Sequence, residues 1–299
     1  MANIYTQLKY HVFFSALDAQ PWIKPDLQAR LGDYIGGILQ RRDTRLITRG
    51  GTSDHVHLLF GMQPTRSVAD TIAAVKASTS RWLKGHTSPF SWQRGYAAFS
   101  VSESEVPAVE RYIREQGHRH STMSFAEELQ RFLDIHGLER RGTSELHPQY
   151  TFHRLRYHLV FSTKNRLWLI PSEASARLHS TIEEVIGREG GEPIETGGMP
   201  DHVHVFLFMK PDQTITRMIK MIKGTSSRWM SETLGPQSPF AWQDGYGAFT
   251  VSESQAAVVQ QYIQRQEEHH RTVSFREELR QLLPPDGLRV LSSPKGVSR

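Results

Sequence analysis

Residues 10–15 read YHVFFS and residues 157–162 read YHLVFS, and both predict a β-strand. Their alternation and their β-branched and aromatic residues are typical of a strand. Residues 54–60 read DHVHLLF and residues 201–208 read DHVHVFLF, with the same offset of 147 positions (202 minus 55). Two motifs that recur at one spacing indicate that the chain contains the same structural unit twice.

A second repeated block shows how far the units extend. Residues 88–104 read SPFSWQRGYAAFSVSES and residues 238–254 read SPFAWQDGYGAFTVSES, now offset by 150 positions (238 minus 88), so three residues enter near Gly235. We therefore predict a first unit over residues 1–135, a polar linker over residues 136–147 and a second unit over residues 148–299. The tail from about residue 284 is expected to be loose.

Strand and helix periodicities alternate within each unit. After the first strand we expect a helix over residues 25–40, then strands over residues 45–48 and 55–60 joined by the turn-rich residues 50–53. An amphipathic helix around residues 68–82, a short strand over residues 98–101 and a third helix follow, and we assign the N-cap of that helix to Ser104. This order predicts the α+β class: two ferredoxin-like (RRM-like) sandwiches, each an antiparallel sheet with helices on one face.

Composition limits the classes of function. The 299 residues carry a formal net charge of +5 and no cysteine, which excludes disulfides, thiolate metal sites and cysteine nucleophiles. The modest positive charge favours a polyanionic partner without identifying one. No apolar run is long enough to cross a bilayer, and the first residues lack the features of a secretory signal. We therefore expect no membrane span and a cytoplasmic location.

Each unit carries a His-x-His motif on a predicted strand: His55 and His57 in the first unit, His202 and His204 in the second. Residues i and i+2 of a strand project from the same face, so each pair can hold one cation between two imidazoles. Such a pair can also simply decorate a sheet face. Both histidines occur in both copies although many neighbouring positions differ, and this favours a metal site.

Tyr112 and Gln116 form a second repeated pair, matched by Tyr262 and Gln266. A spacing of four places both side chains on one face of a helix. A phenol is a weak nucleophile at its usual pKa of about 10, and a nearby cation or base would activate it. For this pair taken alone, a tyrosine that packs its ring beside a solvated glutamine is the alternative.

The two motifs together resemble the HUH single-tyrosine transposases of the smallest insertion sequences and their relatives, the REP-associated tyrosine transposases. HVH on a strand is followed by YIxxQ on a late helix, and YHLVFSTKNR and the WQ-x-GY-x-AF-x-VSES stretch are similar to the same family. The resemblance covers nearly all of both units and implies a tandem duplication within one chain.

The resemblance implies a transposase that nicks and rejoins single-stranded, hairpin-forming DNA. In each unit the two histidines and the glutamine would hold one Mg²⁺ or Mn²⁺, which polarises the scissile phosphate. Tyr112 or Tyr262 would attack phosphorus and leave a 5′-phosphotyrosine and a free 3′-hydroxyl. The family also implies a dimer, which the duplication would build into one chain as a pseudo-dimer. Whether each tyrosine completes the site of its own unit or of the other unit stays open.

The sequence identifies residues that contact DNA less clearly than it identifies the metal ligands and the tyrosines. The candidates are basic residues of the second predicted helix and aromatic residues of the WQ-x-GY stretch, which could bind phosphates and stack on bases: Lys76, Arg81, Lys84, Trp92, Tyr96, Lys223, Arg228, Trp242 and Tyr246. Solvated basic faces and core aromatics would explain the same residues. Four histidines after the third helix are expected to be exposed: His118, His120, His269 and His270. His11 and His158 are interpreted as either structural or functional.

Two other classes of function remain compatible with the sequence. A ferredoxin-like fold also serves RNA recognition, so a domesticated, non-mobile protein could keep hairpin binding without chemistry. Alternatively, the histidine sites could activate water in a metal-dependent phosphohydrolase. A covalent adduct with single-stranded DNA would distinguish the transposase from both.

Overall fold

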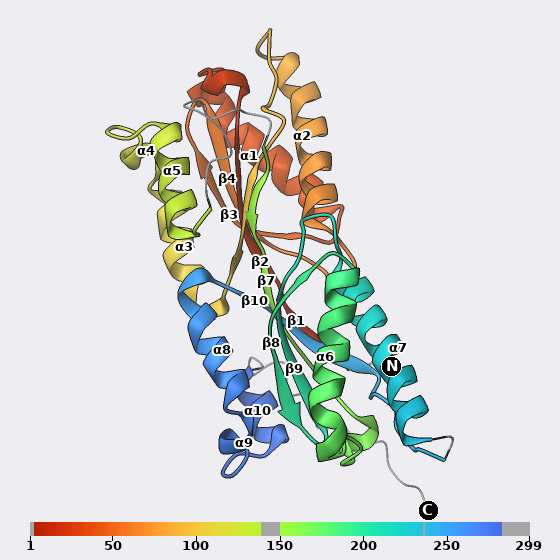
Figure 1. Ribbon diagram of the computed structural model, residues 1–299. Helices are drawn as coiled ribbons and strands as arrows, with labels where there is room; N and C mark the ends of the chain where they lie inside the picture. Colours follow the sequence, from red (N-terminus) through yellow and green to blue (C-terminus); the bar gives the residue numbers. More distant parts are fainter. Residues whose placement is uncertain (1–2, 139–149, 236, 283–299) are drawn as a thin grey trace, which may run out of the picture.

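The computed structural model of the protein describes residues 3–138, 150–235 and 237–282. Most of the linker predicted over residues 136–147 and the whole tail predicted from about residue 284 lie outside these ranges. The described chain forms two five-stranded sheets, placed end to end in an elongated molecule (Figure 1). The predicted α+β class and the duplicated architecture are confirmed.

Both sheets have the same order of strands. The first contains β3 (Arg45–Gly51), β4 (His55–Gly61), β2 (Lys9–Ser15), β5 (Ala97–Val101) and β6 (Phe152–Arg154). The second contains, in the equivalent order, β8 (Glu192–Met199), β9 (His202–Phe208), β7 (Arg156–Ser162), β10 (Gly245–Val251) and β1 (Asn3–Gln7). The first four strands of each sheet are antiparallel and give the predicted ferredoxin-like arrangement.

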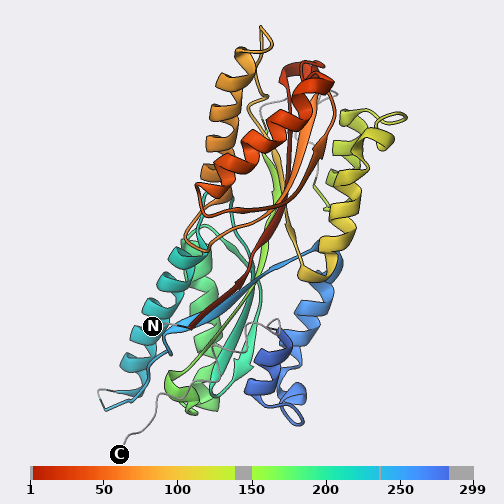
Figure 2. The same ribbon diagram turned by 180° about the vertical axis from the view of Figure 1, so that it is seen from behind.

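The fifth strand of each sheet comes from the other half of the sequence. β1 begins the chain yet pairs in parallel with β10, and β6 pairs in parallel with β5. Figures 1 and 2 show β1 lying in the half of the molecule that contains β7 to β10. The two sheets therefore exchange edge strands, which the sequence repeats did not predict.

Helices cover both faces of each sheet. One face carries the long helices, α1 (Pro25–Gln40) and α2 (Val68–Lys84) on the first sheet, and α6 (Ser172–Arg188) and α7 (Ile215–Leu234) on the second (Figure 2). The prediction placed all helices of a unit, the third helix included, on a single face. The opposite face carries α3 (Val106–Arg114), α4 (Gln116–Arg119) and α5 (Phe125–Ile135), or α8 (Ala256–Gln264), α9 (Gln266–His269) and α10 (Phe275–Leu282).

The second layer of helices follows from the strands, which bury apolar residues on both faces. On β2, Phe14 packs in the core under α1 and α2, whereas its neighbour Phe13 packs against Leu129 and Leu133 of α5. A fully buried strand does not show a polar face, so alternation alone could not reveal that α3 to α5 cover it. The expectation of helices on one face is corrected in this respect.

The serines of the VSES motifs join the two halves of the molecule. The backbone N–H of Ser102 donates to Oγ of Ser252 at 2.8 Å, and the N–H of Ser252 donates to Oγ of Ser102 at the same distance. Helix α3 begins at Val106 with Glu105 as its N-cap, so the assignment of Ser104 as N-cap was wrong. The two halves therefore meet at the ends of β5 and β10 through paired hydrogen bonds.

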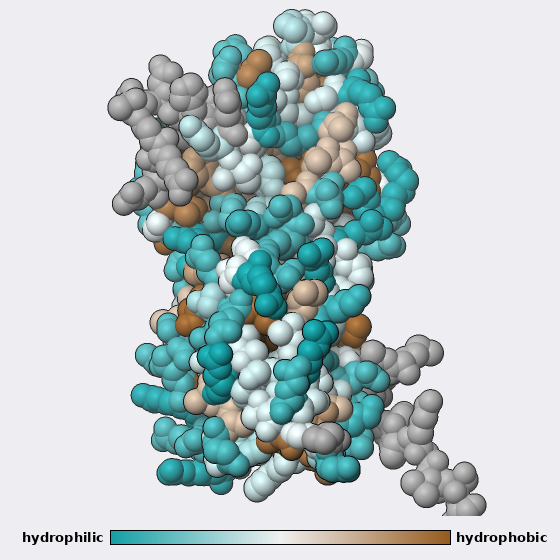
Figure 3. Space-filling model, turned by 45° about the vertical axis from the view of Figure 1, so that its right-hand side comes forward, coloured by the Kyte–Doolittle hydropathy of each residue, from teal (hydrophilic) through white to brown (hydrophobic). Residues whose placement is uncertain are grey.

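No helix in the described part of the chain has the length and hydropathy of a membrane span. On the face drawn in Figure 3, hydrophobic residues form separate spots within a mainly hydrophilic surface.

Candidate active site

The His-x-His motifs lie at the start of β4 and of β9, on the face covered by the late helices. All four imidazoles are buried, as the pattern of alternate residues predicts for one sheet face. The ring centroids of His55 and His57 are 5.0 Å apart, and those of His202 and His204 are 5.1 Å apart. Each pair is therefore close enough to hold a single ion.

Neighbouring side chains fix the orientation of both imidazoles in the first unit. A carboxylate oxygen of Asp54 lies 2.7 Å from Nδ1 of His55, and Nε2 of His11 lies 2.9 Å from Nδ1 of His57. Both Nε2 atoms are thereby directed to the same space. A partner on the second ring nitrogen is a regular feature of metal-binding histidines. Of the two interpretations of His11, support of another histidine through a hydrogen bond is the one observed.

The tyrosine and the glutamine approach this pair from above the sheet. Tyr112 lies on α3, with its ring centroid 6.1 Å from that of His57. Gln116 begins α4, and its Oε1 lies 3.4 Å from Nε2 of His55. The helix can come this close because β3 has glycine at position 50, where a Cβ would lie 2.1 Å from the carbonyl oxygen of Ile113.

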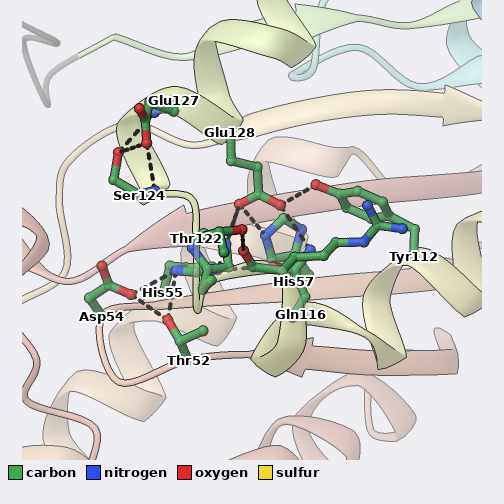
Figure 4. Close-up of polar contacts among 12 residues, drawn as sticks. Thr52, Asp54, His55, His57, Tyr112, Gln116, Thr122, Ser124, Glu127 and Glu128 are labelled. Atoms are coloured by element: carbon green, nitrogen blue, oxygen red, sulfur yellow. Dashed lines mark hydrogen bonds and ion pairs between the residues drawn. The ribbon is translucent and has the colours of Figure 1, made fainter.

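A carboxylate that the sequence interpretation missed lies at the centre of the site (Figure 4). Glu128 of α5 is 1% exposed, and its Oε2 lies 3.2 Å from Nε2 of His57 and 3.1 Å from Nε2 of His120. Its Oε1 accepts hydrogen bonds from Nε2 of Gln116, at 2.8 Å, and from the hydroxyl of Tyr112. Glu128 therefore contacts every group that the two motifs predicted, apart from His55, which lies 3.7 Å away.

A signal for this carboxylate was present in the repeats. Residues 124–129 read SFAEEL and residues 274–279 read SFREEL. Ser124 and Glu127 form a capping box that starts α5, which leaves Glu128 to point into the site. Two adjacent glutamates do not show from spacing alone which of them is buried.

Burial sets the protonation of the first site. It lowers the pKa of His57 to about 4, although the nearby Glu128 opposes the shift, so this imidazole is neutral at neutral pH. Burial and the charge of Glu128 raise the pKa of the Tyr112 phenol well above its usual value. Burial opposes ionisation of Glu128, but hydrogen bonding and charge from His57 hold the pKa of its carboxyl below its usual range. The site thus pairs an ionised carboxylate with a protonated phenol.

The second unit repeats this arrangement around Glu278. Nε2 of His204 lies 3.2 Å from Oε1 of Glu278, and the hydroxyl of Tyr262 donates to the same carboxylate. Nε2 of His202 lies 3.3 Å from Oε1 of Gln266. The orienting partners also recur, at 2.7 Å between Asp201 and His202 and at 2.8 Å between His158 and His204.

Two of the four late histidines belong to the sites. The side chains of His120 and His270 are 9% and 7% exposed, and each lies within 3.5 Å of its glutamate carboxylate, so the expectation that they are exposed was wrong. The turn after each tyrosine helix folds back over the site and carries them inward. His118 is exposed as expected, and His269 is half-buried, 3.9 Å from Glu278.

The donor atoms of each site could hold one metal ion. In both units the two imidazole nitrogens and a carboxylate oxygen lie within 4.8 Å of one another. In the second unit, Nε2 of His204 and Oε2 of Glu278 are buried, and no hydrogen bond of good geometry satisfies them among the described residues, although Nε2 of His204 lies 3.2 Å from Oε1 of Glu278. Buried lone pairs of this kind are satisfied when they coordinate a cation, so the residues fit a divalent metal.

Each tyrosine lies beside the histidines of its own half. The ring centroids of Tyr112 and His57 are 6.1 Å apart, and those of Tyr262 and His204 are 5.6 Å apart. The crossed arrangement that the sequence left open is not the one found in this structure.

The aromatic candidates for DNA contacts are largely core residues. Trp92 and Trp242 are buried, and their Nε1 atoms donate to Thr79 at 2.8 Å and to Ser226 at 2.9 Å. Each closes the core beside a phenylalanine of the first strand, which is the core packing that the sequence left as the alternative to base stacking. Tyr246 is also buried, whereas Tyr96 is half-buried.

The basic candidates divide into two groups. Nζ of Lys76 donates to the carbonyls of residues 93, 94 and 95, and Nζ of Lys223 donates to those of residues 243 and 245. These lysines hold the WQ-x-GY loops in place, which is a structural role; their contact with DNA stays a prediction. Arg81, Lys84 and Arg228 are exposed.

One protein family matches both halves of the chain, and individual proteins match part of it. A family model described as "Transposase IS200 like" matches residues 4–116 and 151–266, more than half of the chain. The ISDra2 transposase TnpA of Deinococcus radiodurans is 33% identical over 120 residues, which are 38% of this chain and 85% of that protein. The transposase for insertion sequence element IS200 of Salmonella typhimurium is 26% identical over 116 residues, 37% of this chain and 76% of that protein.

Two solved structures are also similar. A Deinococcus radiodurans protein described as a transposase is 30% identical, with 43% of this chain and 98% of that chain covered and a TM-score of 0.32. A REP-associated tyrosine transposase bound to a REP hairpin is 14% identical, with 54% and 93% covered and a TM-score of 0.33. The family model, matched once in each half, confirms the family and enzyme class that the motifs indicated: the chain belongs to the IS200-like transposases, which nick and rejoin DNA through a tyrosine.

Proposed function

We propose that this protein is a double transposase in one chain, acting on single-stranded, hairpin-forming DNA. One observation carries the proposal: in each half, a tyrosine hydroxyl, one imidazole of the His-x-His pair and a glutamine amide meet at one buried carboxylate. Residues 1–135 and 148–299 are then two catalytic units that work as an intramolecular pseudo-dimer. Membership of the family supports DNA as the partner, and the resemblance to HUH enzymes supports a hairpin-forming single strand.

The metal site in the first unit would comprise His55, His57, Gln116 and Glu128. In the second unit it would comprise His202, His204, Gln266 and Glu278. A bound cation polarises the scissile phosphate and stabilises charge on its oxygens. Two imidazoles with carboxylate and amide oxygens suit Mn²⁺ as well as Mg²⁺.

Tyr112 and Tyr262 would be the nucleophiles, each in its own unit. Attack forms a bond between the phenol oxygen and phosphorus and breaks the bond to the 3′-oxygen, which leaves a 5′-phosphotyrosine and a strand with a free 3′-hydroxyl. The phenol proton of Tyr112 faces the carboxylate of Glu128, so that oxygen is placed to accept it and to return it to the departing 3′-oxygen. Attack by a 3′-hydroxyl on the phosphotyrosine restores the phosphodiester and releases the tyrosine.

The exposed basic residues remain candidates for holding the strand. Arg81, Lys84 and Arg228 lie on or near solvent-facing turns of α2 and α7, and Tyr96 is partly accessible. Contacts of this kind bind phosphates without selecting a sequence.

Formation of a denaturant-resistant adduct tests this function. The full chain is incubated with Mn²⁺ and a labelled pool of hairpin-bearing single strands, then run on a denaturing gel. We expect a labelled protein band that weakens in Tyr112→Phe and in Tyr262→Phe and disappears in the double variant. The phenylalanines keep the ring packing, so the loss reports the hydroxyl. Absence of a band from the wild-type protein would overturn the proposal in favour of a binding protein or a phosphohydrolase. Persistence of the band in the double variant would show that neither tyrosine is the nucleophile.

A further inference from the structure

A cavity lies beside each candidate active site, between the sheet and the last described helix of the unit. Its volume is about 330 Å³ in the first unit and about 560 Å³ in the second. Six lining positions of the first are Phe13, Ser15, Ala97, Phe125, Leu129 and Phe152. The equivalent positions of the second, at the offsets of the sequence repeat, are Val160, Ser162, Gly247, Phe275, Leu279 and Tyr5. The same feature therefore occurs at the same place in both copies.

One aromatic ring separates each cavity from its imidazole pair. Phe275 lines the second cavity and stacks on His202, with ring centroids 4.1 Å apart and an interplanar angle of 17°. Phe125 lines the first cavity and lies 4.9 Å from the ring of His55. A nucleotide next to a phosphate bound at the imidazoles would therefore lie close to this ring and to the cavity behind it.

The loop after the first strand forms the rim of each cavity and is strained in both copies. Asp18 and Ala19 have φ of 53° and 49°, and Asn165 and Arg166 have φ of 56° and 57°. Two consecutive non-glycine residues in the left-handed region cost free energy, and such strain is concentrated at functional sites. Its presence in both copies indicates that the rim conformation is needed although the residues differ.

The two rims have different chemistry. Residues 17–21 read LDAQP, with one carboxylate and no basic group, whereas residues 164–168 read KNRLW. Lys164 and Arg166 are exposed, and Trp168 is 81% exposed. Cationic groups interleaved with an exposed aromatic ring are the combination with which proteins hold single-stranded nucleic acid.

We infer that the second cavity, with the 164–168 rim, is a subsite for an unpaired nucleobase of the substrate strand. The base enters the cavity beside Phe275, Arg166 in its lining neutralises an adjacent phosphate, and the indole of Trp168, two residues further along the loop, stacks on a neighbouring base. The first cavity lacks both rim groups and binds the strand more weakly, so the two sites differ in their hold on DNA. The inference deepens the proposed function, on which it rests for the identity of the strand.

Binding of an oligothymidylate tests the subsite without the chemistry. The full chain, in EDTA so that no adduct forms, is titrated against a fluorescein-labelled oligothymidylate and followed by anisotropy. Trp168→Ala should weaken binding by about tenfold to a hundredfold, the loss expected for one stacked base. Arg166→Ala should weaken it and reduce its salt dependence. Pro21→Ala, at the position equivalent to Trp168, should bind as the wild type does, and Ala19→Arg should bind more tightly.

An abasic strand of the same length separates stacking from charge. Trp168→Ala and the wild type should bind this strand equally, because it offers no base to stack. The inference would be overturned if Trp168→Ala bound the oligothymidylate as tightly as the wild type does. It would also be overturned if the variant lost affinity equally for both strands. Because Trp168 is exposed, the variant should keep its fold, which far-UV circular dichroism checks.

The subsite and the proposed function can fail separately. If the wild type forms the adduct but Trp168→Ala does not change DNA binding, the subsite is refuted and the transposase function stands. If the variants bind DNA as expected but the wild type forms no adduct, the subsite is supported and the tyrosine chemistry is refuted.

Discussion

The interiors of the two candidate sites are built from the same residue types, whereas their rims are not. His11, His57, Tyr112 and Glu128 have counterparts in His158, His204, Tyr262 and Glu278, with matching contacts. At the rims, by contrast, Asp18 and Ala19 of the first unit are replaced by Asn165 and Arg166 at the equivalent positions of the second. A metal and a nucleophile require fixed donors at fixed distances, while the hold on a strand can change by single residues. The comparison therefore separates what the two halves share from what each has acquired.

Removing one imidazole tests whether the two interiors are independent, and it should have the largest effect. His57→Ala should lower linkage of DNA to Tyr112 by at least about a hundredfold, since the ion loses a ligand beside that phenol, and should leave linkage to Tyr262 nearly unchanged. His204→Ala is the matched control and should give the reverse pattern. Mass analysis of the linked peptides measures both. Loss at Tyr262 caused by His57→Ala would restore the crossed arrangement.

Neutralising one carboxylate tests whether the two glutamates bind the metal in the same way in both halves. Glu128→Gln keeps the shape of the side chain and removes its charge, so Mn²⁺ should bind one of the two sites about tenfold to a hundredfold more weakly. Glu278→Gln should affect the other site equally. Isothermal titration calorimetry of the wild type and both variants reads the two affinities. Two unchanged affinities would show that these glutamates are not ligands.

The two half-buried lysines, Lys76 and Lys223, should contribute differently to stability. Lys76→Met removes a donor to three carbonyls and should lower the free energy of unfolding by about 1–3 kcal/mol; Lys223→Met, which frees two carbonyls, should cost less. The exposed Lys84→Met is the control and should stay within about 0.5 kcal/mol. Urea unfolding provides the values. If Lys76→Met had unchanged stability but bound DNA more weakly, Lys76 would be a DNA contact and not a structural residue.

The smallest effect is expected where the halves meet. Ser102→Ala leaves the backbone N–H of Ser252 without its acceptor and should cost about 1 kcal/mol in urea unfolding. Ser104→Ala is the matched control two residues away and should be neutral, because Ser104 is exposed and Glu105 precedes the helix. A loss of about 1 kcal/mol in the control instead would be typical of an N-cap serine.

Elements with strong local signals could be predicted from the sequence. The helix over residues 25–40 was placed with its observed bounds, because a proline opens it and its apolar residues recur at helical spacing. The His-x-His and Tyr-x-x-x-Gln pairs were found because each is short and repeated, although the expected single helix is divided between Tyr112 on α3 and Gln116 at the start of α4. Their convergence at one site follows from the topology of the ferredoxin-like unit.

Features that depend on distant partners could not be predicted. β1 and β6 are short and polar, and nothing in NIYTQ or FHR shows that each pairs with the other half of the chain. Trp92 was assigned to DNA because an aromatic residue in a loop offers the same sequence signal whether it stacks on a base or closes a core. Glu128 was missed because a buried carboxylate in a helix looks like a surface one until its partners are known.

The account rests on the proximity of each phenol to its own imidazole pair, and mapping the DNA-linked residue tests this most directly. Wild-type protein is incubated with Mn²⁺ and hairpin-bearing single strands, digested, and the peptides that carry a nucleotide are sequenced by mass spectrometry. We predict that phosphotyrosine linked to DNA is found at Tyr112 and Tyr262. A stable link at any other residue, or strand cleavage without a link, would contradict the account.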